Sequence, residues 1–526
     1  MPPALTWELV LSDTQTVPKR RPEVMAVLPA LMLAMLLAML DNMIVSPALP
    51  RIVGEFNGLE HLSWVVTAYI LGTTVSTPIW GKLGDLYGRK NIFLTSIVAF
   101  LIFSALTGAA QSMNQLIAFR ALQGVAAGGL LVGAFAIIGD LVPPRERGRY
   151  QGLMGGVMAV AMIAGPLAGG YITDHLSWRW AFYINLPLGA VALALLTTRL
   201  HLPKYRTEHR IDWVGAVLLS IGITSLVLMA TWGGTQYRWA SVQVIGLAVL
   251  ALASIAGFAA VERRAAEPIL SLGLFANRNF SLTAWIGFLV GFAMFGAIAF
   301  LPLYQQTVQG ASATNSGLLL LPMMAGLLVT SIIGGQVITR TGRYKALPII
   351  GGVMMTLGMF LLSRVDVHTT KTETAVGMVV LGVGMGLLMQ TTMLISQNSV
   401  EQRDLGVASS TATFFRSIGG SFGVAIFGAI FTSRLTADLT TSLGADRAAQ
   451  LSTAGGRIEG DALKAMPAPI RDALLQGISS GMSSIFAWAI IFAAAVAVLA
   501  LFIEEVPLRG SVEPEGESST VVAAAK

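Results

Sequence analysis

Apolar runs of about 20 residues recur along the whole chain, and this recurrence restricts the folds that the chain can adopt. As a helix, a run of that length crosses a hydrocarbon core of about 30 Å. Hydrophobic residues make up 54% of the 526 residues and charged residues only 12%. The sequence therefore predicts an all-α membrane protein that crosses the bilayer many times.

Apolar windows bounded by charged residues or turn clusters predict fourteen transmembrane helices. They begin near Val24, Leu62, Asn91, Gln115, Tyr150, Trp180, Asp212, Val242, Phe280, Ser316, Ala346, Thr374, Leu405 and Gly481. If the N-terminus is cytoplasmic, the inner segments hold 22 of the 34 Lys and Arg residues and the short outer loops hold five. The positive-inside rule therefore favours a multi-pass protein of the cell membrane with both termini in the cytoplasm.

Composition excludes several other functions. The net charge is +6, but the basic residues flank the spans and form no patch with interleaved aromatic residues, so we expect no nucleic-acid partner. The chain has no cysteine, which excludes disulfides and thiol catalysis. It also contains no HExxH or GxxxxGK[ST] motif. We therefore expect neither an enzyme nor an ATP-driven pump, and no metal or other cofactor.

Two pairs of similar segments indicate an internal repeat. GKLGDLYGRK (81–90) resembles GQVITRTGRYK (335–345), with Gly88 aligned to Gly342 and Asp85 to Thr339. VPPRERG (142–148) resembles VEQRDLG (400–406) at the same relative place. Parallel repeats of this kind are typical of transporters that rock around a site at the membrane midplane.

The repeat predicts two six-helix bundles, with the seventh and eighth spans as an inserted pair. The expected units are a cytoplasmic N-terminal segment (1–23), an N-terminal bundle (24–198), a linker with the inserted helices (199–278), a C-terminal bundle (279–505) with a long outer loop (433–478), and a disordered cytoplasmic tail (506–526).

Asp41 lies within the first span, after seventeen residues without a charge. At 1.5 Å per residue it is about 25 Å from Val24, in the outer half of the bilayer. A carboxylate at a span centre costs about 2.5 to 3.5 kcal/mol, so such residues usually face a polar pathway and have a partner. Arg120 enters the fourth span at a similar depth and is the expected partner. We favour proton handling by this pair. Asp41 could instead be a cap or hydrogen-bond anchor near the membrane surface, and Arg120 a structural arginine that binds backbone carbonyls.

Four motifs in order resemble those of the major facilitator superfamily. They are LDNMIVSPALP in span one, the loop GKLGDLYGRK, RALQGVAAGG in span four and AGPLAGG in span five. Over roughly Pro22 to Glu505 the chain is similar to the fourteen-span drug:proton antiporters of that superfamily. The first motif departs from the usual pattern at Ser46–Pro47, where relatives have Asn-Val.

The resemblance implies roles for several residues. Asp41 and Arg120 would couple transport to protons. Asp85 would contact a helix end and basic residues of the opposite bundle, with Arg145, Arg147 or Arg149 as the expected partners, and would close the inner side. The gating loop would comprise Gly81, Asp85, Gly88, Arg89 and Lys90. The glycine-proline pattern that marks exporters comprises Gly165, Pro166, Gly169 and Gly170. Pro166 also removes a helix hydrogen bond and predicts a kink.

A substrate cavity is expected between the bundles. Its candidate lining residues are Gln123, Tyr304, Gln305, Gln390, Phe414 and Arg416.

The predicted function is proton-coupled efflux of amphipathic or cationic small molecules by alternating access, by a monomer in contact with membrane lipids and driven by the proton gradient. Export of one physiological compound, such as a self-made antibiotic or a lipid, is the alternative. A receptor or channel on the same scaffold is less favoured.

Overall fold

The computed structural model describes residues 21–56, 62–202, 212–234, 236–265, 267–270, 272–311, 319–444 and 466–508. Its main helices are α1 (Arg21–Val45), α3 (Leu62–Tyr87), α4 (Arg89–Gly108), α5 (Met113–Leu141), α6 (Pro144–His175), α8 (Asn185–Arg199), α9 (Trp213–Trp232), α10 (Val242–Glu262), α11 (Arg278–Thr307), α13 (Leu321–Thr341), α14 (Ala346–Leu362), α15 (Lys371–Asn398), α16 (Leu405–Leu443) and α19 (Ala468–Leu501). Shorter helical turns are η2 (Ser46–Ala48), α2 (Leu49–Phe56), α7 (Trp180–Tyr183), η4 (Leu272–Ala276) and η5 (Gln402–Asp404).

The predicted all-α membrane class is confirmed. Twelve helices among the described residues are long and apolar enough to cross a membrane. Two further helices coincide with predicted spans: α14 is apolar but has only 17 residues, and α3 is rich in threonine and serine. The count of fourteen spans stays a prediction. The predicted start at Ser316 lies outside the described residues, and α13 begins at Leu321.

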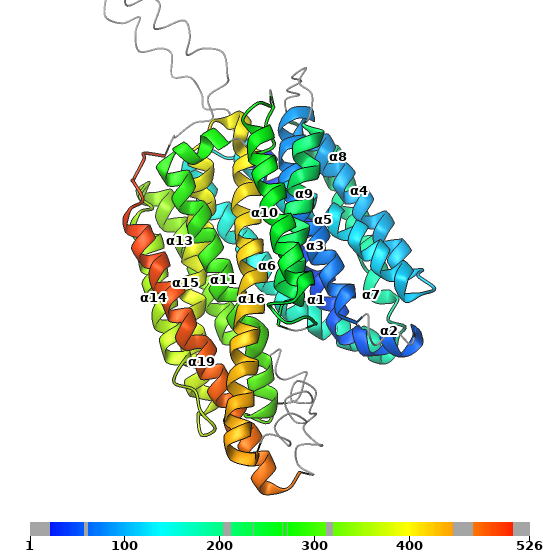
Figure 1. The fold of residues 1–526 in the computed structure, drawn as a ribbon. Helices are drawn as coiled ribbons and strands as arrows, with labels where there is room; N and C mark the ends of the chain where they lie inside the picture. The colour runs from blue at the N-terminus through cyan, green and yellow to red at the C-terminus, as the bar shows by residue number, and fades with distance from the viewer. Residues whose placement is uncertain are drawn as a thin grey trace, which may run out of the picture.

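The last two long helices extend beyond their predicted ends. The 39 residues of α16 and the 34 of α19 correspond to about 58 and 51 Å, well over the thickness of the hydrocarbon core. Both run into the segment 433–478 that was predicted to be a loop, and in Figure 1 they project past the other helices at the bottom. Residues 445–465, 1–20 and 509–526, which include most of the predicted terminal segments, lie outside the described residues.

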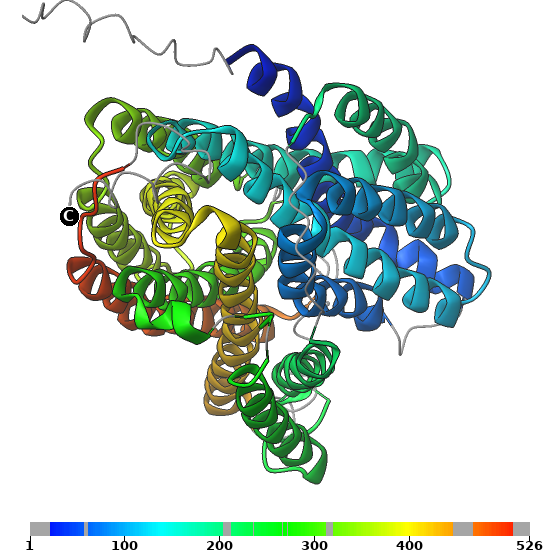
Figure 2. The ribbon, with the colours of Figure 1, turned by 90° about the horizontal axis from the view of Figure 1, so that it is seen from above.

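The long helices form two groups, one of α1 and α3 to α8 and one of α11, α13 to α16 and α19 (Figure 1). Each group is built around a large apolar cluster of its own. Seen from above, α9 and α10 stand outside both groups; α9 lies next to α3 and α16, and α10 packs on α9 (Figure 2). The residue limits predicted for the units stay predictions, but this arrangement is that of two bundles and an added helix pair.

Glycines at equivalent positions of the two repeats make equivalent contacts between the bundles. A Cβ added at Gly81 would stand 2.8 Å from the carbonyl oxygen of Gly406, and one added at Gly148 would stand 3.2 Å from that of Gly335. In the repeat, Gly81 corresponds to Gly335 and Gly148 to Gly406. The two bundles therefore touch through the same pair of positions twice, at the end where α3 meets α16 and α6 meets α13.

Helix α6 packs closely on both bundles. A Cβ at Gly152 would stand 2.6 Å from the Ser331 carbonyl oxygen of α13 in the other bundle. Farther along α6, a Cβ at Gly165 would collide with Met43, and one at Gly169 would collide with the carbonyl oxygen of Ile44 in α1. Gly170 has open space instead. Three of these glycines therefore allow close helix approach, and Gly170 does not need to be glycine for that purpose.

We expect Gly169→Ala to destabilise the protein by about 1 to 3 kcal/mol, because the new methyl group would meet the backbone of α1, which cannot move aside cheaply. Gly170→Ala is the matched control and should change stability by no more than about 0.5 kcal/mol. Thermal unfolding of both variants in the same detergent checks this. Equal unfolding midpoints would contradict the close packing of α6 on α1.

Candidate functional site

Asp41 and Arg120 form the predicted ion pair, and both side chains are fully buried. Asp41 comes from α1, and its Oδ2 accepts a hydrogen bond from Nη1 of Arg120 in α5. Asp41 lies inside α1 and accepts hydrogen bonds from the side chains of Arg120, Gln123 and Asn185, so it caps no helix end. The cap interpretation of Asp41 is therefore wrong, whereas these bonds fit the alternative of a hydrogen-bond anchor.

Two amides complete the surroundings of the Asp41 carboxylate. Its Oδ1 accepts from Nε2 of Gln123 at 2.9 Å and from Nδ2 of Asn185 at 2.8 Å. Asn185 also donates to Oγ of Ser104 at 2.9 Å. The carboxylate is thus held by one cation and two neutral donors from α5 and α8, all within one bundle. Gln123 was predicted to line a substrate cavity, whereas the structure places it in this network.

Arg120 is held by more than Asp41. Its guanidinium lies over the Tyr69 ring at 4.2 Å from the ring centre, and its Nε donates to the Val65 carbonyl oxygen at 3.4 Å. Tyr69 in turn donates to the Ala38 carbonyl oxygen of α1 at 2.6 Å. The remaining nitrogen, Nη2, is buried and has no hydrogen-bond partner. Arg120 therefore has the predicted ionic role and also the structural role that was its alternative, with one donor still unused.

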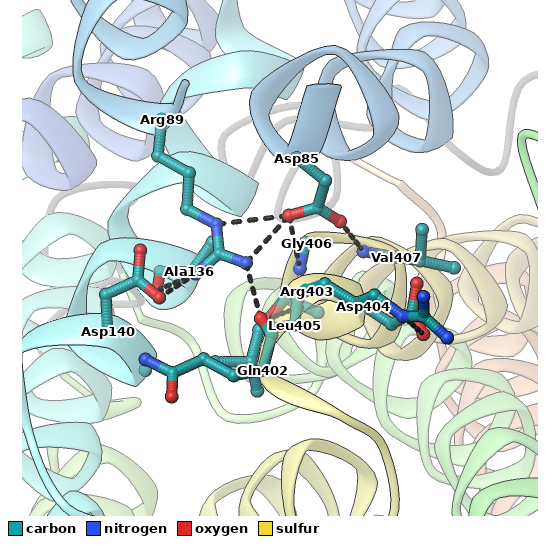
Figure 3. A network of polar contacts seen from close by, with 12 residues as sticks. Asp85, Arg89, Ala136, Asp140, Gln402, Arg403, Asp404, Leu405, Gly406 and Val407 are labelled. Carbon is teal, nitrogen blue, oxygen red and sulfur yellow. Dashed lines mark hydrogen bonds and ion pairs between the residues drawn. The ribbon is translucent and has the colours of Figure 1, made fainter. Parts of the chain in front are cut away.

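A second polar cluster joins the two bundles, and we call it the latch: Asp85, Arg89, Asp140, the Gln402 carbonyl and the first amides of α16 (Figure 3). Asp85 of α3 accepts from the backbone N–H of Gly406 at 3.1 Å and of Val407 at 3.0 Å. The N–H groups of a first helical turn have no partners within the helix and carry partial positive charge. Asp85 therefore contacts a helix end of the opposite bundle, as the family resemblance implied.

Arg89 fixes Asp85 in place. Its Nη2 donates to Oδ1 of Asp85 at 2.8 Å and to the Gln402 carbonyl oxygen at 3.0 Å, and its Nη1 forms an ion pair with Asp140 (Figure 3). The arginine thus bridges α3, α5 and the segment before α16. Gly88, which separates α3 from α4, has φ +93°, a conformation that favours glycine.

The predicted basic partners of Asp85 were wrong. Among the described residues none of the three arginines forms an ion pair with Asp85: Arg145 reaches the Thr339 carbonyl oxygen, and Arg147 donates to the carbonyl oxygens of Val142 and Gly139. Helix amides replace them because the close contact of Gly81 with Gly406 brings α16 directly onto α3.

The two lysines of the gating loop segment, Lys82 and Lys90, bind partners outside the latch. Lys90 donates to the carbonyl oxygens of Thr197 and Leu200 at the end of α8. Lys82 forms a 2.6 Å ion pair with Glu267, in the segment after α10. The latch end of the molecule is therefore also tied to the inserted helices.

The residues predicted to line a substrate cavity lie in different surroundings. Tyr304 is fully buried and donates to the Asp366 carbonyl oxygen, and Gln305 lies beside Met378. Gln390 packs against Gly155 of α6, and its Oε1 has no hydrogen-bond partner. Phe414 belongs to the apolar cluster shared with α9. The common substrate cavity expected of these side chains stays a prediction.

Comparisons with known proteins agree on one family. Residues 31–424 match the family model described as Major Facilitator Superfamily. The chain is 38% identical over 502 residues to Multidrug transporter protein MdtP of Bacillus subtilis, covering 91% of this chain and 92% of that one. It is 39% identical to Multidrug resistance protein 3 of the same organism (89% and 92% covered). An uncharacterized MFS-type transporter of Mycobacterium tuberculosis is 41% identical (91% and 69% covered).

Solved structures support the fold. The proton:xylose symporter XylE bound to 6-bromo-6-deoxy-D-glucose superposes with a TM-score of 0.59 at 14% identity, covering 90% of this chain and 95% of that one. The human organic anion transporter MFSD10 gives the same score and identity, with 90% and 100% covered.

We expect Asp85→Asn to loosen the contact between the bundles at the latch. Hydrogen bonds to a charged group are worth about 1.5 to 3 kcal/mol each, so losing the charge should raise the open population about tenfold or more. The natural chain has no cysteine, so Ser409→Cys, at a fully buried position of α16, provides a clean probe.

The rate at which a membrane-impermeant maleimide labels that cysteine measures opening. Glu401→Gln, a surface carboxylate beside the latch, is the control and should leave the rate unchanged. Labelling of the Asp85→Asn protein at the control rate would show that Asp85 does not hold the bundles together.

Proposed function

The chain belongs to the major facilitator superfamily, and from that premise we propose that it exports amphipathic or cationic small molecules in exchange for protons. The chain is a multi-pass membrane transporter and not an enzyme. The observation that carries the proposal is the fully buried Asp41–Arg120 pair, a titratable carboxylate inside a span. Relatives named as multidrug transport and resistance proteins support the direction and the substrate class.

Asp41 is the proposed proton carrier. While ionised it accepts from Arg120, Gln123 and Asn185. A proton bound to Asp41 makes it a neutral acid, which weakens its attraction to the permanently charged guanidinium. Arg120 then keeps its contacts with Val65 and Tyr69 and retains Nη2 as a free donor. Protonation thus changes the forces within one bundle without removing its main cation.

Helix α6 supplies the proposed connection from Asp41 to the latch end. Met43 and Ile44, two and three residues after Asp41, pack on Gly165 and Gly169 of α6, and the other end of α6 packs on α13 of the opposite bundle. A shift of α1 when Asp41 takes up or releases its proton would therefore move a helix that lies between the bundles. Alternating access follows if that shift separates the two bundles at the end where the latch holds them together.

We place the latch end in the cytoplasm, with both termini, because the gating loop and the start of α6 are rich in basic residues. Protons entering from the outside would then drive export, helped by a membrane potential worth about 2.3 kcal/mol per charge per 100 mV. No bound cofactor is required for this cycle. The Asp41 network lies within one bundle of one chain, so we propose that the monomer is the working unit.

We expect efflux of a cationic dye from energised inverted membrane vesicles to stop when an uncoupler is added. Asp41→Asn should lower gradient-driven transport to background, because the variant has no carboxyl group to carry the proton. Glu55→Gln, which changes a half-exposed carboxylate of the same bundle, is the control and should transport normally. Efflux that persists with the uncoupler, or uphill transport by Asp41→Asn, would contradict the proposal.

Cationic, neutral and lipid-like compounds in the same assay separate broad export from export of one compound.

Arg120→Lys should reduce uphill transport about tenfold or more. Lysine keeps the charge but is a point donor, so it cannot reach Asp41, Gln123 and the Val65 carbonyl in one planar arrangement. Transport rates measured with and without a pH gradient check this. If the ratio of the two rates is the same in Arg120→Lys as in the natural chain, Arg120 has the structural role alone.

A further inference from the structure

Two carboxylates, the half-buried Asp212 and the buried Glu262, meet at the latch-end termini of the inserted helices. Asp212 caps α9, with its Oδ1 accepting from the Gly215 N–H at 2.9 Å. Glu262 is the last residue of α10 and is only 4% exposed. Its Oε1 accepts from the Leu270 N–H at 2.6 Å. Each carboxylate thus has one oxygen occupied by a backbone donor.

The other oxygen of each carboxylate is buried without a hydrogen-bond partner. These atoms are Oδ2 of Asp212 and Oε2 of Glu262. Both face Gly215: a Cβ added there would collide with the Asp212 oxygen and stand 3.1 Å from that of Glu262. The two free oxygens are therefore close neighbours that face the same small space.

The charged groups around the pair do not neutralise it. Lys82 of α3 faces this region, but its Nζ already forms the 2.6 Å ion pair with Glu267. Asp404, at the end of η5, adds further negative charge. Arg263 and Arg264, which follow Glu262, are exposed. Among the described residues Lys82 is the cation that acts on Glu262, and it is already paired with Glu267, so the two carboxylates have no counterion of their own.

Two carboxylates that share a site repel each other when both are ionised. A hydrogen bond between a carboxylic acid and a carboxylate needs only two oxygens, whereas Ca²⁺ or Mg²⁺ takes six or more ligands. We propose that Asp212 and Glu262 share one proton through their free oxygens, and that this proton helps to hold the latch end closed.

The pair is connected to the latch through the segment after α10. Glu262 holds the Leu270 N–H, and Leu270 belongs to the same apolar cluster as Val407, whose N–H binds Asp85. Glu267 of that segment binds Lys82 of the gating loop. When the shared proton leaves to solvent, two negative charges repel each other and push the ends of α9 and α10 apart. The closed state is therefore favoured at low pH and is weakened as pH rises.

This inference goes beyond the proposed export function and does not rest on it. It concerns proton binding and opening in a resting protein, without a gradient or a substrate. The measurements below therefore remain informative if the efflux experiment fails, and the efflux experiment remains informative if they fail.

Infrared difference spectra of the full chain in lipid nanodiscs test the shared proton. We expect a protonated carboxyl band at neutral pH that is lost in both Asp212→Asn and Glu262→Gln. Asparagine is as good a helix cap as aspartate, so Asp212→Asn should keep α9 intact. Glu504→Gln, an exposed carboxylate at the same end, should keep the band. A band that survives in either variant would overturn the sharing.

Distances between spin labels test the link to opening. Labels on Thr198→Cys of α8 and Thr341→Cys of α13 report on the separation of the two bundles, and both positions are exposed. We expect one short distance at low pH and a growing longer one as pH rises. Glu262→Gln and Asp212→Asn should keep the short distance at every pH, since neither pair can carry two charges. The same pH response in these variants as in the natural chain would refute the proposal.

Discussion

A carboxylate removed from water is the constraint on which the rest of this structure depends. Asp41 is fully buried in α1, and its charge is tolerable because Arg120 and two amides surround it. Removing one partner from a buried pair of this kind typically costs about 3 to 5 kcal/mol. The bundle therefore has to keep α1, α5 and α8 aligned around the Asp41 carboxylate. A change in the charge of Asp41 alters the forces on all three helices.

Glycine contacts extend that constraint to the interface between the bundles. The residues next to Asp41 lie directly on α6 at Gly165 and Gly169, and α6 lies directly on α13 at Gly152. Backbone packed on backbone has no flexible side chain to absorb a displacement, so a movement of α1 is passed on. The latch opposes such movement at a different place, where Asp85 binds the first amides of α16.

The sequence was informative where a single residue or motif carries the physics. The similar depth of Asp41 and Arg120 in the membrane, counted along their two helices, was enough to predict that they pair. Gly88 and Gly342, which the repeat aligns, both have a positive φ. It failed where partners come from backbone or from distant segments. The family resemblance indicated that Asp85 would contact a helix end, but nothing in the order of residues indicated that helix amides would replace its expected arginine partners, or that Asp212 and Glu262 would meet. Asn185, a lone amide in an apolar span, was a signal that we overlooked. Chemical type alone does not decide which residues line the predicted cavity, because glutamine and tyrosine also satisfy buried carbonyls, as Tyr304 does.

The central claim is that Asp41 gives up a proton when cargo binds. The most direct measurement is the number of protons released when a transported cationic dye binds to the purified protein, obtained by calorimetry in buffers of different ionisation enthalpy. The account predicts about one proton per dye for the natural chain, the same release for Glu55→Gln, and none for Asp41→Asn. Equal release by the natural chain and by Asp41→Asn would contradict it.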